Sequence, residues 1–305
     1  MYSTETFCSY LLHQKKYSHN TVEAYRRDLT EFESYLNLFY NGTTLNQCDD
    51  MIIRSWFAQL MEKGIKATSI KRKKAALTSF YKYLLKHNQI KKIPGKTVNT
   101  PKAEKRLPAF IPETKMDELF ETDFFSITDY EDLRNRMILE TFYATGIRVS
   151  ELVSLTNLSF DIQKQHIKVV GKRNKERLVP LHPLYMKMIE HYNKIKNTTF
   201  ANTDTEDSFF LTKKGKKIYR KFAYRVIFSY LSSVTSMKKK SPHVMRHTFA
   251  THLLNEGAEI NAIKDMMGHT SLAATQLYTH NTIEKLKTVY KKAHPQSQKR
   301  RNTWE

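Results

Sequence analysis

Apolar side chains recur every three or four residues through much of the stretch 1–92, the spacing of helices that each bury one face. Residues suited to capping helices precede three such stripes: Ser18 and Asn20, then Asp49 or Asp50, then Thr68 or Ser69. The stripes are Tyr25, Leu29, Phe32 and Tyr35, then Ile52, Trp56, Phe57 and Leu60, and finally Leu77, Phe80, Tyr81 and Leu84. This pattern predicts a helical domain over residues 1–92.

Prolines interrupt the helical pattern after this domain. They lie in the stretch 93–112 with lysine and threonine between them, and they are Pro94, Pro101, Pro108 and Pro112. Such a composition favours extended chain and predicts an interdomain linker. A second domain is then expected over residues 113–294, followed by a basic, polar tail over 295–305.

The second domain changes its pattern once. Residues 166–170 (HIKVV) and 176–181 (ERLVPL) are short β-type runs, and GKRNK separates them, which is typical of a hairpin. Helical spacing precedes them at 132–143 and returns from Pro183 onward. The predicted fold class is therefore mainly α, with a small antiparallel β-sheet in the second domain.

The charge of the chain narrows the choice of partner. Lysine and arginine number 51 against 30 aspartates and glutamates, a formal net charge of +21. Like charges repel one another in a folded chain, and a polyanion relieves that repulsion. Nucleic acid is the favoured partner because neutralised phosphates release counterions. A generally basic protein and a membrane-surface binder are the alternatives.

The cysteines and the N-terminus exclude other classes. Cys8 and Cys48 cannot form a disulfide framework, and no CxxC spacing suggests zinc. The first residues lack the apolar core and cleavage site of a signal peptide, and no apolar run reaches transmembrane length. We expect a cytoplasmic protein without a membrane partner.

A run of cations lies near the start of the third predicted helix: Lys71, Arg72, Lys73 and Lys74. Positive charge there opposes the helix dipole, so a different interaction has to favour it. Contact with DNA phosphates is one interpretation, and a solvated helix face is the other.

Two fragments of the second domain carry cations at exposed turns. In TGIRVSEL (145–152), Arg148 follows Gly146 at a loop-to-helix junction, where its donors can face an anion. At the hairpin tip, Lys172 and Arg173 can enter a DNA groove. Taken alone, an arginine at a helix start is more often a surface or ion-pair residue, and turns are rich in lysine.

A third fragment, SPHVMRHTFATHLL (241–254), begins a helix with Ser241 as cap and Pro242 in the first turn. His243 and Arg246 are three residues apart, so both can contact one ligand. The fragment lacks the glutamate of an HExxH zinc motif, and an arginine beside the ligands would repel a metal. No metal site is predicted.

A fourth fragment, MMGHTSLAATQLYTH (266–280), contains Gly268 as a helix end, His269 in the connection and Tyr278 on the next helix. Alone, such a tyrosine is an ordinary core residue. Together, the four fragments supply what phosphoryl transfer needs without a metal. Two guanidinium groups can neutralise the negative charge on the non-bridging oxygens in the transition state. A phenol can attack phosphorus, and a cation can protonate the leaving oxygen.

These fragments resemble the tyrosine recombinase (phage integrase-like) family, and most of all its Xer-type members. The motifs that carry the resemblance are TGIRVSEL, the Gly-Lys hairpin, HVMRH, MGH and LYTH, with Tyr278 nine residues after His269. The likeness extends to NTVEAYRRDL (20–29) and SIKRKKAALTSFYKYL (69–84), which resemble the family's SAM-like core-binding domain. GKRNK departs from the family by lacking a second glycine.

The resemblance implies a role for each matching residue. Arg148 and Arg246 would bind the scissile phosphate, and Lys172 would be the general acid, with Lys175 as the alternative. His243 would help to accept the proton of Tyr278, the nucleophile, and His269 would bind a non-bridging oxygen. Glu151 would support the site, or it would form a simple ion pair.

The resemblance also implies a partner and an assembly. Two domains would enclose double-stranded DNA as a C-shaped clamp, and a homo- or hetero-tetramer would act on paired sites, with or without a second recombinase. No cofactor is implied, since the phosphotyrosyl link keeps the phosphodiester energy. The segment 282–294 would dock on a neighbouring subunit or fold back on its own domain. A DNA-binding module that does not cut and a type IB topoisomerase are the competing hypotheses.

Overall fold

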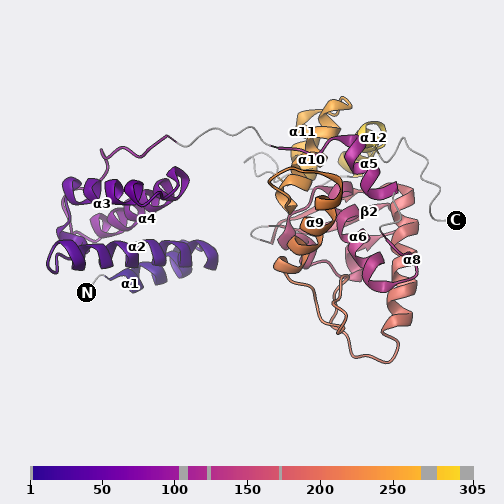
Figure 1. The fold of residues 1–305 in the computed structure, drawn as a ribbon, viewed down its shortest axis with the longest axis horizontal. Coiled ribbons are helices and arrows are strands. Elements are labelled where there is room, and N and C mark those ends of the chain that lie inside the picture. The colour runs from indigo at the N-terminus through magenta and orange to yellow at the C-terminus, as the bar shows by residue number, and fades with distance from the viewer. Residues whose placement is uncertain (1–2, 103–108, 122–124, 172–173, 269–279, 296–305) are drawn as a thin grey trace. The chain divides into compact units, whose positions relative to one another are not determined.

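The structure is a computed structural model that describes residues 3–102, 109–121, 125–171, 174–268 and 280–295. The chain divides into two compact units, Met1–Arg106 and Leu107–Glu305 (Figure 1). Lys172, Arg173, His269 and Tyr278 lie outside the described residues. Among the described helices, none is both long enough and apolar enough to cross a bilayer.

The first unit is a small helical bundle. Its elements are α1 (Thr4–Ser9), the π-helix η1 (Tyr10–Gln14), α2 (His19–Phe39), the short 3-10 helix η2 (Leu45–Gln47), α3 (Asp50–Glu62) and α4 (Ala67–Lys86). Ser18 and Asp49 cap α2 and α3 with their side chains, as the sequence predicts. The predicted start of α4 is wrong: the helix begins at Ala67, and the residue before it, Lys66, makes no side-chain cap.

Aromatic side chains fill the core of this unit. Phe32 of α2 packs against Trp56 of α3 with ring centroids 4.6 Å apart, and Phe7 of α1 meets Phe80 of α4 edge-on at 5.3 Å. All four are at most 1% exposed. Burying aromatic rings of this size is a large part of the stability of a domain as small as this. Both cysteines are buried here as free thiols.

The second unit is larger and contains the sheet. Its helices are α5 (Glu113–Glu121), α6 (Tyr130–Thr145), α7 (Val149–Val153), η3 (Asn157–Ser159), α8 (Pro183–Thr199), α9 (Arg220–Val234), α10 (Pro242–Asn255), α11 (Ile260–Met267) and α12 (His280–Ala293). Its strands are β1 (Phe160–Asp161), β2 (His166–Val170) and β3 (Glu176–Pro180), paired antiparallel in that order. The predicted class, mainly α with a small antiparallel sheet, is confirmed.

Helix α6 is the centre of this unit and packs against α8, α9 and α10. It is buried on nearly every side from Leu133 to Thr145, so its sequence has no polar stripe. Its buried threonines Thr141 and Thr145 satisfy their hydroxyls by bonding to backbone carbonyls one turn earlier. The helix ends where Gly146 adopts a left-handed conformation, with φ of +57°.

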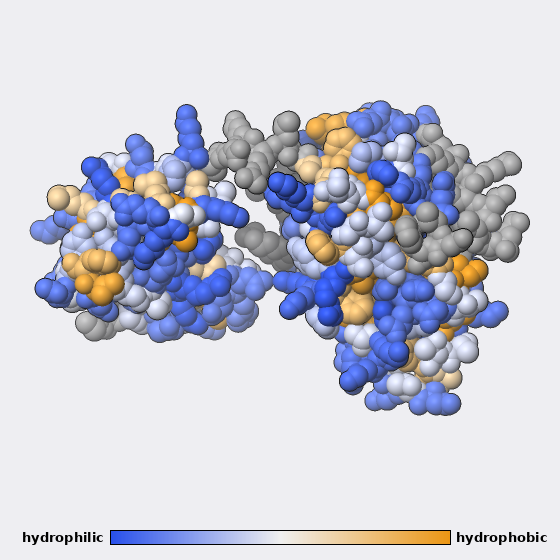
Figure 2. All heavy atoms as spheres, viewed as in Figure 1, coloured by the Kyte–Doolittle hydropathy of each residue, from blue (hydrophilic) through white to orange (hydrophobic). Residues whose placement is uncertain are grey.

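The last described helix lies on its own unit. Side chains of α12, including Leu286 and Tyr290, form one apolar cluster with Phe249 of α10 and Met266 of α11. The alternative that the segment 282–294 folds back on its own domain is therefore the arrangement in this single chain. On the visible face of each unit, hydrophilic side chains predominate over scattered apolar ones (Figure 2).

Candidate active site

Arg148 occupies the junction between α6 and α7, as the sequence predicts. It is the N-cap residue of α7, directly after the turn at Gly146 and Ile147. Glu151, three residues later, accepts hydrogen bonds from the Arg148 backbone N–H at 2.7 Å and from its guanidinium at 2.9 Å. The side chain of Arg148 remains 38% exposed, while that of Glu151 is 3% exposed. Arg148 is thus held on one edge and open to a ligand on another.

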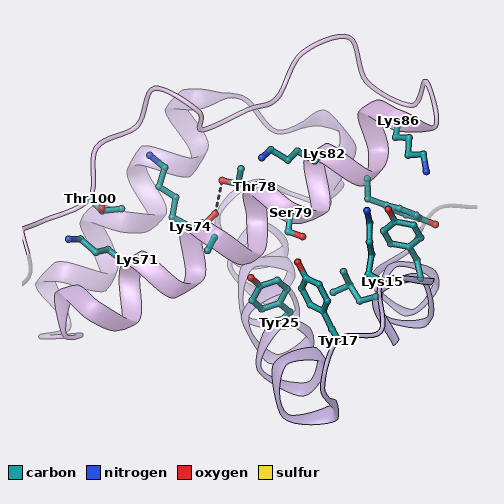
Figure 3. A pocket seen from close by; sticks show the side chains of 14 residues that line it. Lys15, Tyr17, Tyr25, Lys71, Lys74, Thr78, Ser79, Lys82, Lys86 and Thr100 are labelled. Carbon is teal, nitrogen blue, oxygen red and sulfur yellow. Dashed lines mark hydrogen bonds between the residues drawn. The ribbon is translucent and has the colours of Figure 1, made fainter. Parts of the chain in front are cut away.

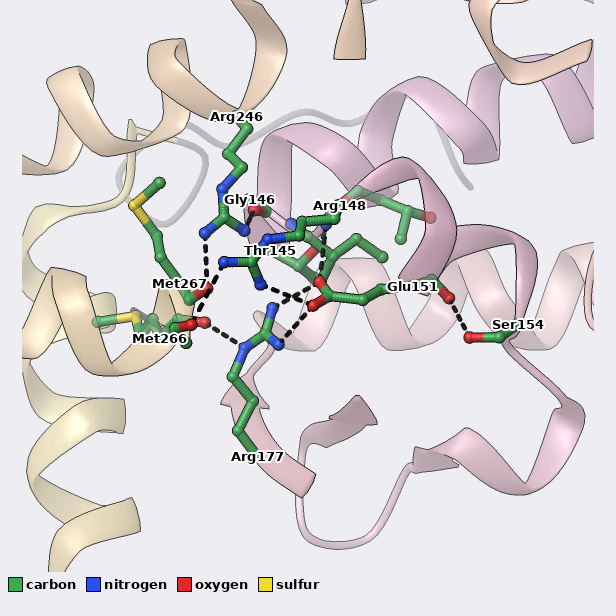
Figure 4. Close-up of polar contacts among 12 residues, drawn as sticks. Thr145, Gly146, Arg148, Glu151, Ser154, Arg177, Arg246, Met266 and Met267 are labelled. Atoms are coloured by element: carbon green, nitrogen blue, oxygen red, sulfur yellow. Dashed lines mark hydrogen bonds and ion pairs between the residues drawn. The ribbon is translucent and has the colours of Figure 1, made fainter. Parts of the chain in front are cut away.

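Arg177 of β3 is a site residue that the sequence analysis missed. Its Nη1 and Nη2 atoms donate to the two carboxylate oxygens of Glu151 at 3.0 and 2.8 Å (Figure 4). Its Nε atom donates to the carbonyl of Met266 at 2.7 Å. A signal was present in the sequence, because strand alternation places Arg177 on the same face as the buried Val179. A charged side chain on a core-facing strand position requires a buried partner.

Arg246 reaches the same place from α10. Ser241 caps this helix and Pro242 lies in its first turn, as predicted, which fixes where Arg246 falls. Its guanidinium donates to the carbonyl of Gly146 at 2.5 Å and to that of Met267 at 2.6 Å. The residue is only 7% exposed. The helix start predicted from sequence therefore positions a buried cation beside the α6–α7 turn.

Three arginines converge on three successive carbonyls where α11 ends. Arg177 binds that of Met266, Arg246 that of Met267, and Arg148 that of Gly268 at 3.3 Å (Figure 4). The carbonyl end of a helix carries partial negative charge and favours cations. From Gly268 the chain continues directly into His269 and the segment that contains Tyr278. The cation cluster therefore adjoins the predicted catalytic segment along the chain.

The cluster has more positive than negative charge. Among the described residues, Glu151 is the one carboxylate that pairs with any of these three guanidinium groups, and it pairs with Arg148 and Arg177. Burial and the nearby charges of Arg148 and Arg177 lower the pKa of Arg246 to about 10. Burial would raise the pKa of Glu151, but hydrogen bonds and charge from Arg177 and Arg148 outweigh it and hold that pKa below its usual value. A surplus of two positive charges favours an anionic ligand.

His243 and Lys175 are described, and both are exposed. His243 lies in the first turn of α10, one turn before Arg246. Lys175 lies at the hairpin, where its carbonyl accepts a hydrogen bond from the Gly171 N–H at 2.7 Å. Within the described ranges, no three His, Cys, Asp or Glu side chains are grouped so that they could hold a metal ion.

The four cations of α4 do not share one environment. Lys73 is 5% exposed and its ammonium pairs with Asp28 and Glu31 of α2. Arg72 also pairs with Asp28, although its side chain is 42% exposed. Lys73 was predicted to contact DNA, but a buried and doubly paired ammonium belongs to the interior of the domain. Lys73 therefore leaves the set of residues that we assign to DNA.

Lys71 and Lys74 instead line a concavity of about 700 Å³ on the first unit (Figure 3). Further lysines and several tyrosines line it as well, namely Lys15, Lys82, Lys86, Tyr10, Tyr17, Tyr25 and Tyr83. These residues are not consecutive in the sequence, so a run of cations does not indicate them. Residues 74, 78, 82 and 86 are four apart, so they follow one face of α4. The concavity combines cations and phenol groups without a carboxylate in its lining.

Comparison with known proteins identifies the family. Residues 111–285 match the phage integrase family, and residues 4–88 match the phage integrase N-terminal SAM-like domain. The chain is 34% identical to tyrosine recombinase XerC of Chlorobaculum parvum, with 95% of this chain and 94% of that protein covered. It is 36% identical to XerC of Pelotomaculum thermopropionicum, with 96% and 98% covered, and 34% identical to XerD of Haemophilus influenzae, with 92% and 94% covered.

Solved structures show the same fold. The XerH site-specific recombinase in a post-cleavage complex with difH substrate matches with a TM-score of 0.72 at 20% identity, covering 95% of this chain and 84% of that one. The Tn1549 transposon integrase with transposon right-end DNA matches with a TM-score of 0.66 at 18% identity, covering 93% and 98%. The chain belongs to the phage integrase family of tyrosine recombinases. It is a site-specific DNA recombinase of the Xer-like type, which cleaves and rejoins DNA.

Proposed function

We propose that Tyr278 attacks the scissile phosphate and forms a 3′-phosphotyrosyl bond, releasing a free 5′ hydroxyl. The observation that carries this proposal is the surplus of positive charge that the described residues Arg148, Arg177 and Arg246 form around the carboxylate of Glu151. Such a site suits the negative charge that develops on the non-bridging oxygens in the transition state. The 5′ hydroxyl of another strand then attacks the phosphotyrosyl bond and reseals the DNA without ATP.

Arg148 and Arg246 would hold the phosphate. Each guanidinium has five N–H donors, and hydrogen bonds within the described residues use two of them in Arg148 and two in Arg246. The bonds to Glu151 and to backbone carbonyls fix each guanidinium plane before the ligand arrives. The remaining donors are available to phosphate oxygens, and an arginine fixed in this way loses little entropy on binding.

The proton transfers would involve the other predicted residues. Lys172 would protonate the departing 5′ oxygen, and Lys175, on the same hairpin, is the alternative acid. His243, exposed and one turn before Arg246, would help to accept the proton of Tyr278. His269 follows Gly268 directly and would donate a hydrogen bond to a non-bridging oxygen.

The DNA partner would be held by both domains. We assign residues 1–92 to core binding, 93–112 to the linker, 113–294 to catalysis and 295–305 to a basic tail. The lysine-rich concavity of the first unit supports a DNA contact there through Lys71 and Lys74, with Lys82 and Lys86 on the same helix face. Arg72, half-exposed, and Arg173, which lies between β2 and β3 in the sequence, are further candidates. The clamp around double-stranded DNA implied by the resemblance remains part of this proposal.

A tetramer on two paired sites would carry out the exchange, composed of identical subunits or of this protein with a second recombinase. A solved structural relative, the lambda integrase, is a tetramer bound to a Holliday junction. The exchange would resolve chromosome or plasmid dimers, or it would invert or integrate a mobile element. Identity of 34–36% to XerC proteins over almost the whole chain supports the Xer type.

The test is a nicked duplex that traps the covalent intermediate. Duplexes with candidate core sites are incubated with the protein, and a denaturing gel reveals any covalent protein–DNA band. Wild type forms the band in the presence of EDTA, and Tyr278→Phe does not. If Tyr278→Phe formed the band as well as wild type, the proposed nucleophile would be wrong.

The matched control is Tyr290→Phe. Tyr290 lies on α12 and its buried hydroxyl has no hydrogen-bond partner among the described residues. Removing that hydroxyl is expected to leave the covalent band at the wild-type level. A loss of the band in both variants would indicate a general defect of the C-terminal helices rather than the loss of a nucleophile.

A further inference from the structure

Arg177 connects two parts of the site that carry the predicted phosphate-binding arginines. It lies within β3 and is 4% exposed. Three of its donors are used in hydrogen bonds, two to the carboxylate of Glu151 and one to the carbonyl of Met266. A planar guanidinium bound at both of these places fixes their relative position.

The first connection leads to Arg148. Glu151 Oε1 accepts from Nη1 of both Arg177 and Arg148, at 3.0 and 2.9 Å. Glu151 Oε2 accepts from Arg177 Nη2 at 2.8 Å and from the Arg148 backbone N–H at 2.7 Å. Each oxygen is thus shared by the two arginines. The bidentate pair with Arg177 sets the plane of the carboxylate, and that plane sets where the Arg148 guanidinium lies.

The second connection leads to the end of α11. Arg177 Nε donates a hydrogen bond to the carbonyl of Met266. The next two carbonyls along the chain, those of Met267 and Gly268, accept hydrogen bonds from Arg246 and Arg148. Contact here is close, because a methyl group placed on Gly268 would lie 3.0 Å from both Cδ and Nη1 of Arg177. Gly268 has φ of +63° and ends the helix immediately before His269. A shift of Arg177 would therefore move the carbonyls that both other arginines use.

We propose that Arg177 is a positioning residue for strand cleavage: through Glu151 and the end of α11 it fixes Arg148 and Arg246 in the geometry that binds the scissile phosphate. It does not touch the DNA itself, since its guanidinium is buried and bonded within the protein. This inference rests on the proposed function. A purely stabilising ion pair is the competing explanation, and the two differ in what removal of Arg177 does to cleavage in a folded, DNA-bound protein.

The variants have to separate these explanations. Arg177→Met alone leaves the Glu151 carboxylate buried opposite a methionine, and such a variant can fail to fold. The double variant Arg177→Met, Glu151→Gln removes both charges of the pair and keeps similar volumes. Arg177→Lys keeps the positive charge but not the bidentate geometry. Glu176→Gln, the neighbouring position on β3, is the matched control because its carboxylate pairs with Lys168 on the exposed side.

Three quantities are measured for each variant: the melting temperature, the dissociation constant for a duplex carrying the core site, and the single-turnover rate of covalent adduct formation on the nicked duplex. In the double variant we expect cleavage to slow by about 10- to 100-fold, as a small misplacement of catalytic groups does. DNA affinity is expected to stay within about threefold, since the phosphate contacts along the duplex are unchanged. Arg177→Lys is expected to be intermediate and Glu176→Gln to match wild type.

A second substrate identifies the cause of the slower rate. A methylphosphonate at the scissile position has no charged non-bridging oxygen for Arg148 and Arg246 to neutralise. If Arg177 positions those arginines, the ratio of wild-type to double-variant rates shrinks on this substrate. If Arg177 only stabilises the fold, a smaller active fraction lowers the amount of adduct on both substrates equally. The ratio of wild-type to double-variant rates is then the same on both substrates, and the proposal is overturned.

The outcomes distinguish this inference from the proposed function. Wild-type cleavage together with a double variant that cleaves equally fast overturns the role of Arg177 and leaves Tyr278 as nucleophile. A wild type that forms no adduct on any recognised site overturns the proposed function itself.

Discussion

At the residue scale, the described part of the site depends on one carboxylate, Glu151, among three guanidinium groups. Glu151 is 3% exposed and bonded to Arg148 and Arg177, while Arg246 bonds to backbone carbonyls nearby. Removing the carboxylate would leave Arg177 buried without its counter-charge. Breaking a buried ion pair in this way typically costs about 3–5 kcal/mol.

Glu151→Gln is therefore expected to lower the melting temperature markedly at neutral pH, and the effect should depend on pH. The pKa of Glu151 in the folded protein lies below its usual value, because hydrogen bonds and charge from the arginines outweigh the effect of burial. As pH falls below about 4.3, the unfolded chain binds this proton first, so the wild type loses the stabilisation. Thermal denaturation should show a constant gap between the two proteins near neutrality and a narrowing gap below that pH.

A gap that stayed the same down to acid pH would mean that the Glu151 carboxylate does not stabilise the fold through its charge. Glu176→Gln, on the exposed side of β3, is the control and should show little change at any pH.

The sequence predicted where Arg148 and Arg246 lie relative to the starts of their helices. It did not predict which residues these side chains contact. Arg148 at a helix start and Arg246 after the Ser241 cap follow from local rules of capping and spacing. Arg177 was not predicted as a site residue, because the β-type pattern of residues 176–181 indicates a strand and not the partner of a charged side chain within it. Its partners Glu151 and Met266 are 26 and 89 residues away, a relation that only the fold provides.

At the element scale, the turn that ends α6 fixes the site. Gly146 adopts φ of +57°, and its carbonyl accepts a hydrogen bond from the guanidinium of Arg246. A methyl group on this residue would lie 2.3 Å from Cδ1 of Phe249, which is fully buried on α10. The position therefore requires glycine for its backbone conformation and for the close approach of α10.

Gly146→Ala is expected to destabilise the second unit and to slow cleavage. The left-handed conformation costs an L-residue about 1–2 kcal/mol of folding free energy. The side-chain and backbone shifts needed to avoid the clash with Phe249 cost about 1–3 kcal/mol more. Gly257→Ala is the matched control: Gly257 has φ of +82°, but nothing lies within 4 Å of the added methyl group. Urea denaturation should show the smaller, strain-only cost for Gly257→Ala. Equal costs for the two variants would mean that the contact with Phe249 does not constrain the turn.

The start of a helix was predictable where a side chain caps it. Ser18, Asp49 and Ser241 cap their helices through side-chain oxygens. The sequence indicated all three as caps, Ser18 together with Asn20 and Asp49 as an alternative to Asp50, and both Asn20 and Asp50 lie inside the helices. Thr68 and Ser69, the predicted caps of α4, lie inside that helix, and its N-cap residue Lys66 makes no side-chain hydrogen bond that would mark the start. Strand β1, with two residues, is too short for any hydrophobic pattern to indicate.

At the scale of the whole molecule, the net charge of +21 is the property that matters for DNA binding. Each phosphate contact releases condensed counterions, so affinity falls with the logarithm of the salt concentration. The lysine-rich concavity of the first unit and the arginine cluster of the second each have more positive than negative charge among the described residues. Of the predicted α4 cations, Lys73 shows why charge runs alone mislead, since its charge is neutralised inside the domain.

DNA affinity should therefore fall by about 10³- to 10⁵-fold between about 50 and 200 mM salt, the behaviour of six to ten phosphate contacts. Lys82→Gln with Lys86→Gln should reduce the slope of the logarithmic plot by about two. Lys213→Gln is the control, because Lys213 pairs with Glu131 and is not part of the concavity. An affinity that changed little with salt would contradict electrostatic binding through these surfaces.

The central claim is that Tyr278 forms the covalent bond to DNA, and mapping the adduct tests it most directly. Trypsin is expected to release residues 265–285, between Lys264 and Lys285, and this peptide contains a single tyrosine. After nuclease trimming of the trapped intermediate, mass spectrometry should find a nucleotide attached to this peptide, with fragmentation placing it on Tyr278. A nucleotide on any other peptide, or on His269 or Ser271 within this one, would contradict the account.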